Sequence, residues 1–309
     1  MDSPRAAASP PSFFNSSLTD WPSTSTLRWS CRAATKTRVR TKKTITAPVT
    51  PRIASTIQST FIPGCYAPRQ QYFRFVEPLR RPPIAFAHRG ASAHAAENTL
   101  EAFRLALRLG ATGLESDVWL SADGVAVLRH DGRIGGRFRR RTIAEVDRAD
   151  LGAGVPALAE LYAVCGTGFE LSLDVKTPEA AEAVMEVAAA ADGAVERLWL
   201  CHPDWERLVT WRSQWPDVHL VDSTRLRLMR DGPERRAAQL ASAGIDAVNL
   251  HHADWSAGLT TLFHRFGRLA FAWDAQHERI LRDLLRMGID GVYSDYVDRM
   301  VEALQESAG

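Results

Sequence analysis

From residue 84 onward, short apolar runs alternate with segments whose apolar residues recur at helical spacing. Such short runs, largely apolar throughout, are typical of strands that are buried on both faces. We expect eight core strands, at residues 84–87, 113–120, 169–175, 197–201, 218–221, 247–250, 269–273 and 291–294. A small additional strand is predicted at 125–129.

Most of these strands are followed by a predicted helix, at 99–109, 178–191, 204–213, 233–243, 256–266, 277–287 and 296–306. Asn98 precedes the first helix and can cap it, because its side-chain oxygen can accept a backbone N–H of the first turn. Strands that alternate with helices form parallel β-α-β units, and eight units over about 230 residues match a (β/α)8 barrel, or TIM barrel. We therefore predict an α/β fold of this type, with an open doubly wound sheet as the alternative.

The first 80 residues differ from the rest of the chain. They are rich in Ser, Thr, Pro, Ala and Arg and lack apolar periodicity, which predicts a disordered or low-order basic leader at 1–80 before the barrel domain at 81–309. The leader has 12 Lys and Arg against three acids, whereas residues 81–309 have 26 against 33.

A basic leader of this kind suits a nucleic acid or a membrane surface, but it also suits a solvated tail. A transit peptide and a natural start further along the chain, for example at Val76, are further hypotheses. We favour the solvated tail or the later start, because aromatic residues are not interleaved with the basic ones as nucleic-acid stacking requires. We therefore predict no nucleic-acid partner.

Composition indicates a globular protein, with 45% hydrophobic and 24% charged residues. No apolar run approaches the roughly 20 residues that span a bilayer, and no secretory signal is evident. The four cysteines form no C-x-x-C pair, which fits a reducing compartment. We therefore predict a cytoplasmic protein without a transmembrane segment, and its oligomeric state stays open.

Three carboxylates stand on two of the predicted strands, where a barrel of this kind carries its chemistry. Glu115 and Asp117 are two residues apart and so share one face of a strand, and Asp174 lies near the end of the next core strand. Carboxylates this close repel unless a cation lies between them or one is protonated. The pattern predicts a divalent metal site, with Mg²⁺ or Ca²⁺ favoured by the oxygen ligands, although an E-x-D pair also occurs on solvated strands.

Two histidines and two cations complete this set of residues. His88 and His130 follow separate predicted strands and can serve as general acid and base on opposite sides of a phosphorus atom. Arg89 and Lys176 are suited to holding a phosphate, and they can equally form salt bridges with the nearby acids.

The order of these residues resembles the glycerophosphodiester phosphodiesterase family over about residues 82–305. The resemblance rests on motifs that follow one another as in the family: His88-Arg89-Gly90, Glu97-Asn98-Thr99, Glu115-x-Asp117, His130-Asp131, Leu173-Asp174-Val175-Lys176, Phe271-Ala272-Trp273 and Ser294-Asp295.

The resemblance implies metal-dependent hydrolysis of glycerophosphodiesters, such as glycerophosphocholine, to sn-glycerol 3-phosphate and an alcohol. It implies that Glu115, Asp117 and Asp174 bind the metal and that His88 and His130 are the acid and base. It further implies that Arg89 and Lys176 hold the phosphate and that Trp273 packs against the glycerol.

The chain departs from the family at several places, among them Ala96, which stands where Pro usually precedes Glu-Asn-Thr. Asp174 stands where Glu is usual, which leaves the metal preference open, and Asp274 stands where Thr is common. A short stretch at 137–141 with four arginines replaces a longer insertion, and we expect it to widen phosphate recognition or to favour an anionic headgroup. The alternatives are a lysophospholipase D-type phosphodiesterase acting on lysophospholipids and a non-catalytic barrel that binds a phosphate ester.

Overall fold

The computed structural model describes residues 76–135 and 140–308. In this part of the chain, eight parallel strands pair side by side, and β1 pairs with β2 as well as with β11, so that the sheet closes into a barrel. The predicted TIM barrel is therefore confirmed. The barrel strands are β1 (Ile84–Ala87), β2 (Gly113–Leu120), β6 (Glu170–Val175), β7 (Leu198–His202), β8 (His219–Ser223), β9 (Ala247–His251), β10 (Leu269–Trp273) and β11 (Gly291–Ser294).

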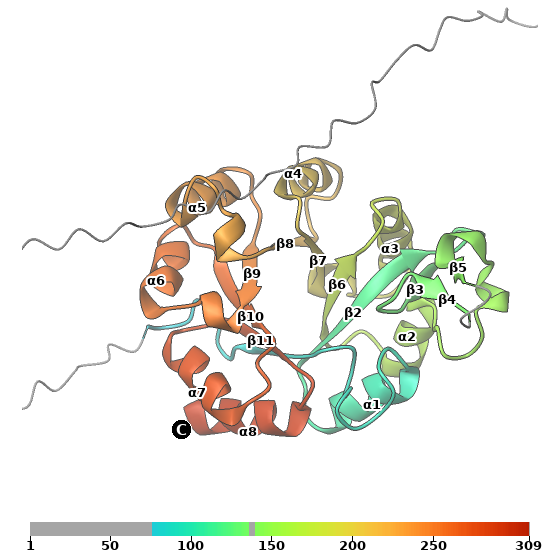
Figure 1. The fold of residues 1–309 in the computed structure, drawn as a ribbon, viewed down its shortest axis with the longest axis horizontal. Helices are drawn as coiled ribbons and strands as arrows, with labels where there is room; N and C mark the ends of the chain where they lie inside the picture. The colour runs from blue at the N-terminus through green and yellow to red at the C-terminus, as the bar shows by residue number, and fades with distance from the viewer. Residues whose placement is uncertain (1–75, 136–139, 309) are drawn as a thin grey trace, which may run out of the picture. The chain divides into compact units, whose positions relative to one another are not determined.

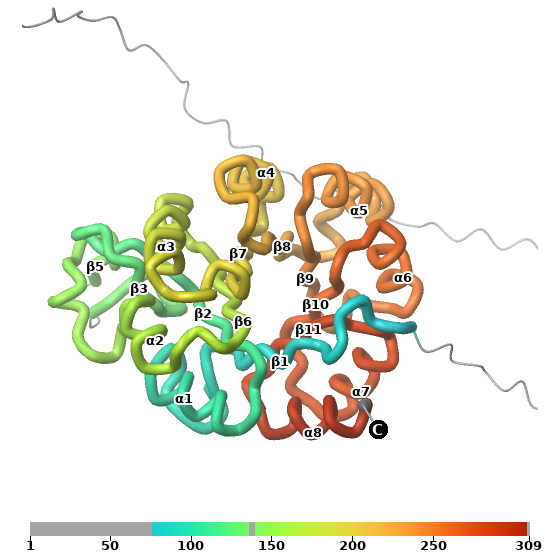
Figure 2. The backbone as a smooth tube through the Cα atoms, turned by 180° about the vertical axis from the view of Figure 1, so that it is seen from behind, coloured from blue at the N-terminus to red at the C-terminus, as the bar shows by residue number. Residues whose placement is uncertain are grey.

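The helices surround the strands, as both views of the chain show (Figures 1 and 2). They are α1 (Leu100–Arg108), α2 (Leu158–Cys165), α3 (Ala180–Ala189), α4 (Trp205–Gln214), α5 (Pro233–Ser242), α6 (Ala257–Arg265), α7 (Glu278–Arg286) and α8 (Val297–Ala308). The sequence pattern did not predict α2, because its eight residues form a short and mostly apolar run that periodicity cannot assign. No helix in the described ranges is both long and apolar enough to cross a bilayer.

An insertion follows β2 before the chain reaches α2. Strand β3 (Ala126–Leu128) runs antiparallel to β2, which confirms the small strand predicted there. Two short strands, β4 (Arg133–Ile134) and β5 (Arg141–Thr142), pair with each other next (Figure 1). Part of the arginine stretch at 137–141 and nearly all of the predicted leader at 1–80 lie outside the described residues.

Aromatic side chains fill the middle of the barrel. Phe86 stacks on Tyr293 with ring centroids 4.5 Å apart, and Phe271 meets Phe86 edge-on at 5.6 Å. Trp199 meets Phe271 at 5.2 Å. Because this layer blocks the barrel axis, a substrate can reach the strand ends from the mouth but cannot enter between the strands.

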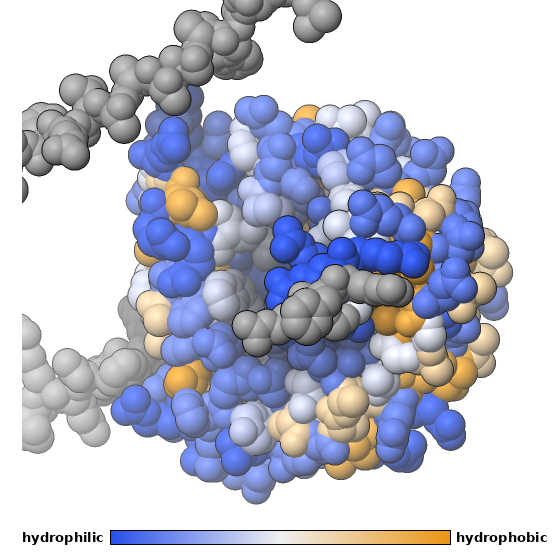
Figure 3. Space-filling view, turned by 45° about the vertical axis from the view of Figure 1, so that its right-hand side comes forward, coloured by the Kyte–Doolittle hydropathy of each residue, from blue (hydrophilic) through white to orange (hydrophobic). Residues whose placement is uncertain are grey.

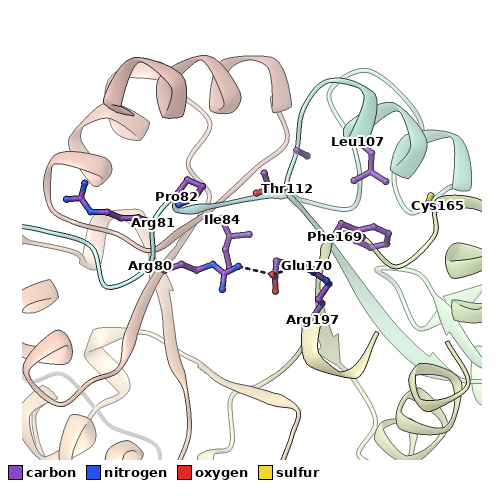
Figure 4. A pocket seen from close by; sticks show the side chains of 12 residues that line it. Arg80, Arg81, Pro82, Ile84, Leu107, Thr112, Cys165, Phe169, Glu170 and Arg197 are labelled. Atoms are coloured by element: carbon purple, nitrogen blue, oxygen red, sulfur yellow. Dashed lines mark hydrogen bonds and ion pairs between the residues drawn. The ribbon is translucent and has the colours of Figure 1, made fainter. Parts of the chain in front are cut away.

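A buried carboxylate, that of Glu170, lies at the opposite end of the barrel, where the strands begin. Arg80 reaches Glu170 with Nη2 2.8 Å from Oε1 (Figure 4). The indole N–H of Trp199 donates to Oε2 of the same carboxylate at 2.7 Å. A cavity of about 440 Å³ lies beside this ion pair (Figure 4). These residues stand at strand starts, so they support the barrel and lie away from the predicted site.

Candidate active site

The three predicted acids come together at the barrel mouth. Asp117 on β2 pairs in register with Asp174 on β6, so the parallel strands bring their side chains to the same face. One carboxylate oxygen from each of Glu115, Asp117 and Asp174 lies within 4.8 Å of the others. Glu115 is only 5% exposed and Asp117 only 2%, so two of the acids are shielded from water.

Burial raises the pKa of Glu115 to about 8, and the charges of Asp117 and Asp174 add to this effect. Burial also raises the pKa of Asp174. Among the described residues, Asp117 Oδ2 has no hydrogen-bond partner although it is buried. We call these three carboxylates the acidic centre. They crowd negative charge together and leave one buried oxygen without a hydrogen bond, so the acidic centre fits a hard divalent cation.

Two cations lie against these acids. Lys176 Nζ is 2.6 Å from Asp117 Oδ1 and 3.3 Å from Asp174 Oδ2. Burial alone lowers the pKa of Lys176, but Asp174 and Asp117 raise it by more, so the ammonium stays charged. Arg89 lies with Nε 3.6 Å from Asp117 Oδ2. The salt bridges to the nearby acids, which were the alternative role expected for Arg89 and Lys176, are therefore present.

A tight turn after β1 places His88 and Arg89. Arg89 adopts a φ of +54°, and its backbone N–H donates to Glu115 Oε2 at 2.9 Å. Gly90 follows with a φ of +79°, and a Cβ there would lie 2.8 Å from the backbone carbon of Ala102. The turn therefore requires glycine at this position, both for its conformation and for the close approach of α1.

Asn98 does not cap α1, so that prediction was wrong. Thr99 is the N-cap, and its hydroxyl accepts the backbone N–H of Ala102 at 3.2 Å. Asn98 has a φ of +56°, and its Oδ1 accepts a 2.6 Å hydrogen bond from the hydroxyl of Ser116. Ser116 stands between Glu115 and Asp117 on β2, so Asn98 ties the turn after β1 to the strand that carries two of the acids.

His88 points across the mouth between an acid of β2 and one that follows β11. Its Nδ1 lies 2.6 Å from Asp295 Oδ1, and its Nε2 lies 3.8 Å from Glu115 Oε2. Burial lowers the pKa of His88, but the charge of Glu115 and the hydrogen bond to Asp295 raise it to about 9. The hydrogen bond to the carboxylate of Asp295 therefore favours the protonated form of the His88 ring.

Asp295 was not assigned a role from the sequence. It follows β11, and β11 pairs with β1, whose last residue precedes His88. The hydroxyl of Ser92 and the amide of Gln276 donate to its carboxylate at 2.9 and 3.0 Å. One feature of the sequence could have indicated a role for Asp295. It directly follows the last predicted strand, and in a closed barrel the last strand pairs with the first, which leads into His88.

His130 follows β3 and is connected to the acidic centre through the backbone. The N–H of Arg129 donates to the carbonyl oxygen of Asp117 at 2.9 Å. The His130 side chain is 41% exposed, and its Nδ1 is 3.1 Å from Asp131 Oδ1. His130 also lines a cleft that opens beside Lys176, at Thr177.

Trp273 ends β10 at the barrel mouth. Its ring meets His251 edge-on with centroids 4.6 Å apart, and the guanidinium of Arg225 lies 5.5 Å from the ring centroid. Asp254 holds Arg225 through a 2.6 Å contact to Nε. His251 Nε2 is in turn 3.1 Å from Oδ2 of Asp274, the residue that replaces the common Thr. Trp273 is therefore fixed from two sides.

Comparison with known proteins agrees with this arrangement. A model described as "Glycerophosphoryl diester phosphodiesterase family" matches residues 88–299. The chain is 28% identical over 239 residues to a probable glycerophosphodiester phosphodiesterase 2 of Mycobacterium tuberculosis, covering 72% of this chain and 90% of that protein.

Two solved structures share the barrel. A glycerophosphodiester phosphodiesterase from Thermotoga maritima superposes with a TM-score of 0.62 at 25% identity, covering 72% of this chain and 99% of the other. A phosphodiesterase from Oleispira antarctica, in complex with the product sn-glycerol-3-phosphate, gives 0.63 at 23% identity, covering 72% and 97%.

Fold and site together define a (β/α)8 enzyme whose acids and basic groups meet at the mouth of the barrel. The family match covers the turn after β1, both strands that carry the acids, and the end of β11. The chain belongs to the glycerophosphoryl diester phosphodiesterase family, as the residue pattern predicted.

Proposed function

We propose that this protein hydrolyses glycerophosphodiesters to sn-glycerol 3-phosphate and an alcohol with the help of a divalent metal ion. The observation that carries the proposal is the convergence of three carboxylates within 4.8 Å of one another, with His88 Nε2 3.8 Å from one of them. The related Oleispira antarctica phosphodiesterase was solved with sn-glycerol-3-phosphate, which supports this product.

Glu115, Asp117 and Asp174 would hold the metal, Mg²⁺ or Ca²⁺, through carboxylate oxygens. When bound, the ion supplies positive charge that stabilises the negative charge developing on the phosphoryl oxygens. Asp174 is one methylene shorter than the usual Glu, which leaves the choice between the two ions open.

The histidines divide the proton transfers. His88 holds a proton and is oriented by Asp295, so it donates to the leaving alkoxide as the general acid. His130, which is more exposed, accepts the proton of the attacking oxygen. That oxygen belongs either to water or to the glycerol hydroxyl of the substrate.

The remaining residues bind the substrate. Arg89 and Lys176, which contact Asp117 in this structure, would hold the phosphate through their positive charges. Trp273, held by His251 and Arg225, presents an apolar surface to the glycerol. The cytoplasmic location inferred from composition stays a prediction.

The test is release of glycerol 3-phosphate from glycerophosphocholine and glycerophosphoethanolamine with Mg²⁺, with Ca²⁺ and with EDTA. We expect release that depends on metal and is lost in His88→Ala. His94→Ala is the matched control, because His94 is exposed and contacts Asp298. Choline release from lysophosphatidylcholine, without activity on either diester, would instead support the lysophospholipase D alternative.

A further inference from the structure

A cleft of about 930 Å³ lies on the side of the insertion, and His130 forms part of its lining. It lies between the end of β3 and the β4–β5 pair, and Thr177, which follows Lys176, forms part of its wall. Figure 3 shows one face of the molecule, on which hydrophilic residues predominate and apolar ones are interspersed. The residues relevant here are Trp119, Arg129, His130, Asp131, Arg133 and Arg140.

The charge of this cleft is unbalanced. Three arginines line it against one carboxylate, Asp131, which already contacts His130 at 3.1 Å. Within the described ranges, no carboxylate lies within 4.0 Å of these arginines, whereas Arg89 contacts Glu97 at 2.9 Å. Guanidinium groups without protein partners at a cleft favour an anionic ligand.

One of these groups is also buried without a partner. Arg129 Nε is shielded from solvent and makes no hydrogen bond to the described residues. A buried donor of this kind costs free energy until an acceptor reaches it. Because Arg129 and His130 both line the cleft, a ligand bound there can contact Arg129 and the proposed general base together.

The wall that carries these residues is held firmly. The indole N–H of Trp119 donates to the carbonyl oxygen of Arg129 at 2.8 Å. The Trp119 ring packs so closely on Gly132 that a Cβ there would lie 2.5 Å from it. The carbonyl of Gly132 also accepts the N–H of Ile143 at 2.9 Å. The segment is therefore ordered before any ligand arrives.

We propose that this cleft receives the alcohol part of the substrate and selects alcohols that carry a negative charge, such as a phosphate or a carboxylate. The inference rests on the proposed function, since His130 belongs both to the cleft and to the proposed proton transfer. Trp273, at the end of β10, would hold the glycerol on the other side of the phosphorus. Strands β1 and β11 lie between β10 and β2, the strand that the insertion follows.

The test compares substrates whose alcohol parts share a three-carbon skeleton and differ in whether they carry an anionic group. These are glycerophosphoglycerol, the same diester with a phosphate on its distal hydroxyl, and glycerophosphoglycerate, which carries a carboxylate. We expect kcat/KM to be at least about tenfold higher for a charged diester than for the neutral one. The phosphate and carboxylate forms show which anion the arginines prefer.

Arg133→Gln should lower the ratio of charged to neutral kcat/KM from about tenfold to near one. Arg108→Gln, at an exposed position of α1 and outside the cleft lining, should keep the wild-type ratio. Equal kcat/KM for charged and neutral diesters in the wild-type protein, or an unchanged ratio in Arg133→Gln, overturns the cleft assignment alone. Failure to hydrolyse any of the three diesters overturns the proposed function and the cleft assignment together.

Discussion

His88 Nδ1 lies 2.6 Å from Asp295 Oδ1, and this contact joins the turn after the first barrel strand to the residue after the last one. A hydrogen bond between charged groups at this distance fixes the ring and favours its protonated form. With Nδ1 engaged, Nε2 is left facing Glu115. Asp295 is therefore a positioning residue for the proposed general acid.

Asp295→Asn should lower kcat/KM by about tenfold to a hundredfold, because the His88 ring loses its charged partner. Without this acceptor the pKa of His88 falls from about 9, so the alkaline limb of the pH profile of kcat/KM should move to lower pH. The control is Asp298→Asn, the same change three residues further on at an exposed aspartate that contacts His94. A uniform loss of activity with an unmoved alkaline limb would contradict the assignment.

The positions of the barrel strands could be predicted from sequence because each is buried on both faces. The runs that begin at residues 84, 113, 247, 269 and 291 start where β1, β2, β9, β10 and β11 start. Helix α2 was missed for the same physical reason, since an eight-residue apolar segment looks like a strand or a helix equally well. Local pattern therefore located the barrel strands but not every helix around them.

Of the candidate site, too, only the relations between residues close in sequence could be predicted from local pattern. Glu115 and Asp117 share a strand face, and that relation can be read from a spacing of two. The pair formed by His88 and Asp295 spans 207 positions and exists only because the barrel closes. The role of Asn98 was likewise hidden, because its hydrogen bond to Ser116 depends on how the turn after β1 folds onto β2.

Glu115→Gln should abolish the stabilisation by metal without lowering the stability of the metal-free protein at alkaline pH. Burial raises the pKa of Glu115 from its ordinary 4.5 to about 8, so the stability contributed by this group falls as the pH rises across that interval. The amide stays neutral, and the metal-free variant should therefore have a Tm at pH 8.5 no lower than that of the wild-type protein. The same variant loses a metal ligand, so Mg²⁺ or Ca²⁺ should no longer raise its Tm.

The measurement is thermal unfolding with EDTA and with a hundredfold excess of either ion over its Kd. The wild-type Tm should rise by at least about 5 °C with metal. Glu186→Gln, at an exposed position of α3, should behave as wild type. A metal-induced rise that survives in Glu115→Gln would place the ion elsewhere.

Gly90 and Gly124 form a matched pair for testing the turn after β1. Both have a φ of +79°, but a Cβ at Gly90 would lie 2.8 Å from the backbone of Ala102, whereas at Gly124 nothing lies within 4 Å. Gly124→Ala should therefore cost only the conformational strain, about 1–2 kcal/mol. Gly90→Ala should cost more and should also lower kcat by displacing His88. Equal losses of unfolding free energy in the two variants would show that the contact with α1 does not matter.

Asp222 supplies a prediction about stability that is independent of catalysis. It lies on β8 with no exposed surface, and its carboxylate oxygens have no hydrogen-bond partner in the described ranges, although Arg236 Nε is 3.3 Å away. Burial raises the pKa of Asp222 from 3.8 to about 6, against the charge of Arg236. The native state thus holds this proton more tightly than the unfolded state, and the stability it contributes is lost as the pH rises from about 4 to 6.

Asp222→Asn removes this dependence while keeping the shape of the side chain. Between pH 4.5 and 7.5 the free energy of unfolding of the variant, relative to wild type, should rise by about 2 kcal/mol. Any constant cost of leaving Arg236 without its partner cancels in that difference. Urea unfolding at the two pH values measures it, with Asp231→Asn as the control, because Asp231 faces Arg235 at 3.7 Å on the exposed surface. Parallel pH dependence in wild type and Asp222→Asn would mean that the carboxylate is already ionised and solvated in the native protein at pH 4.5.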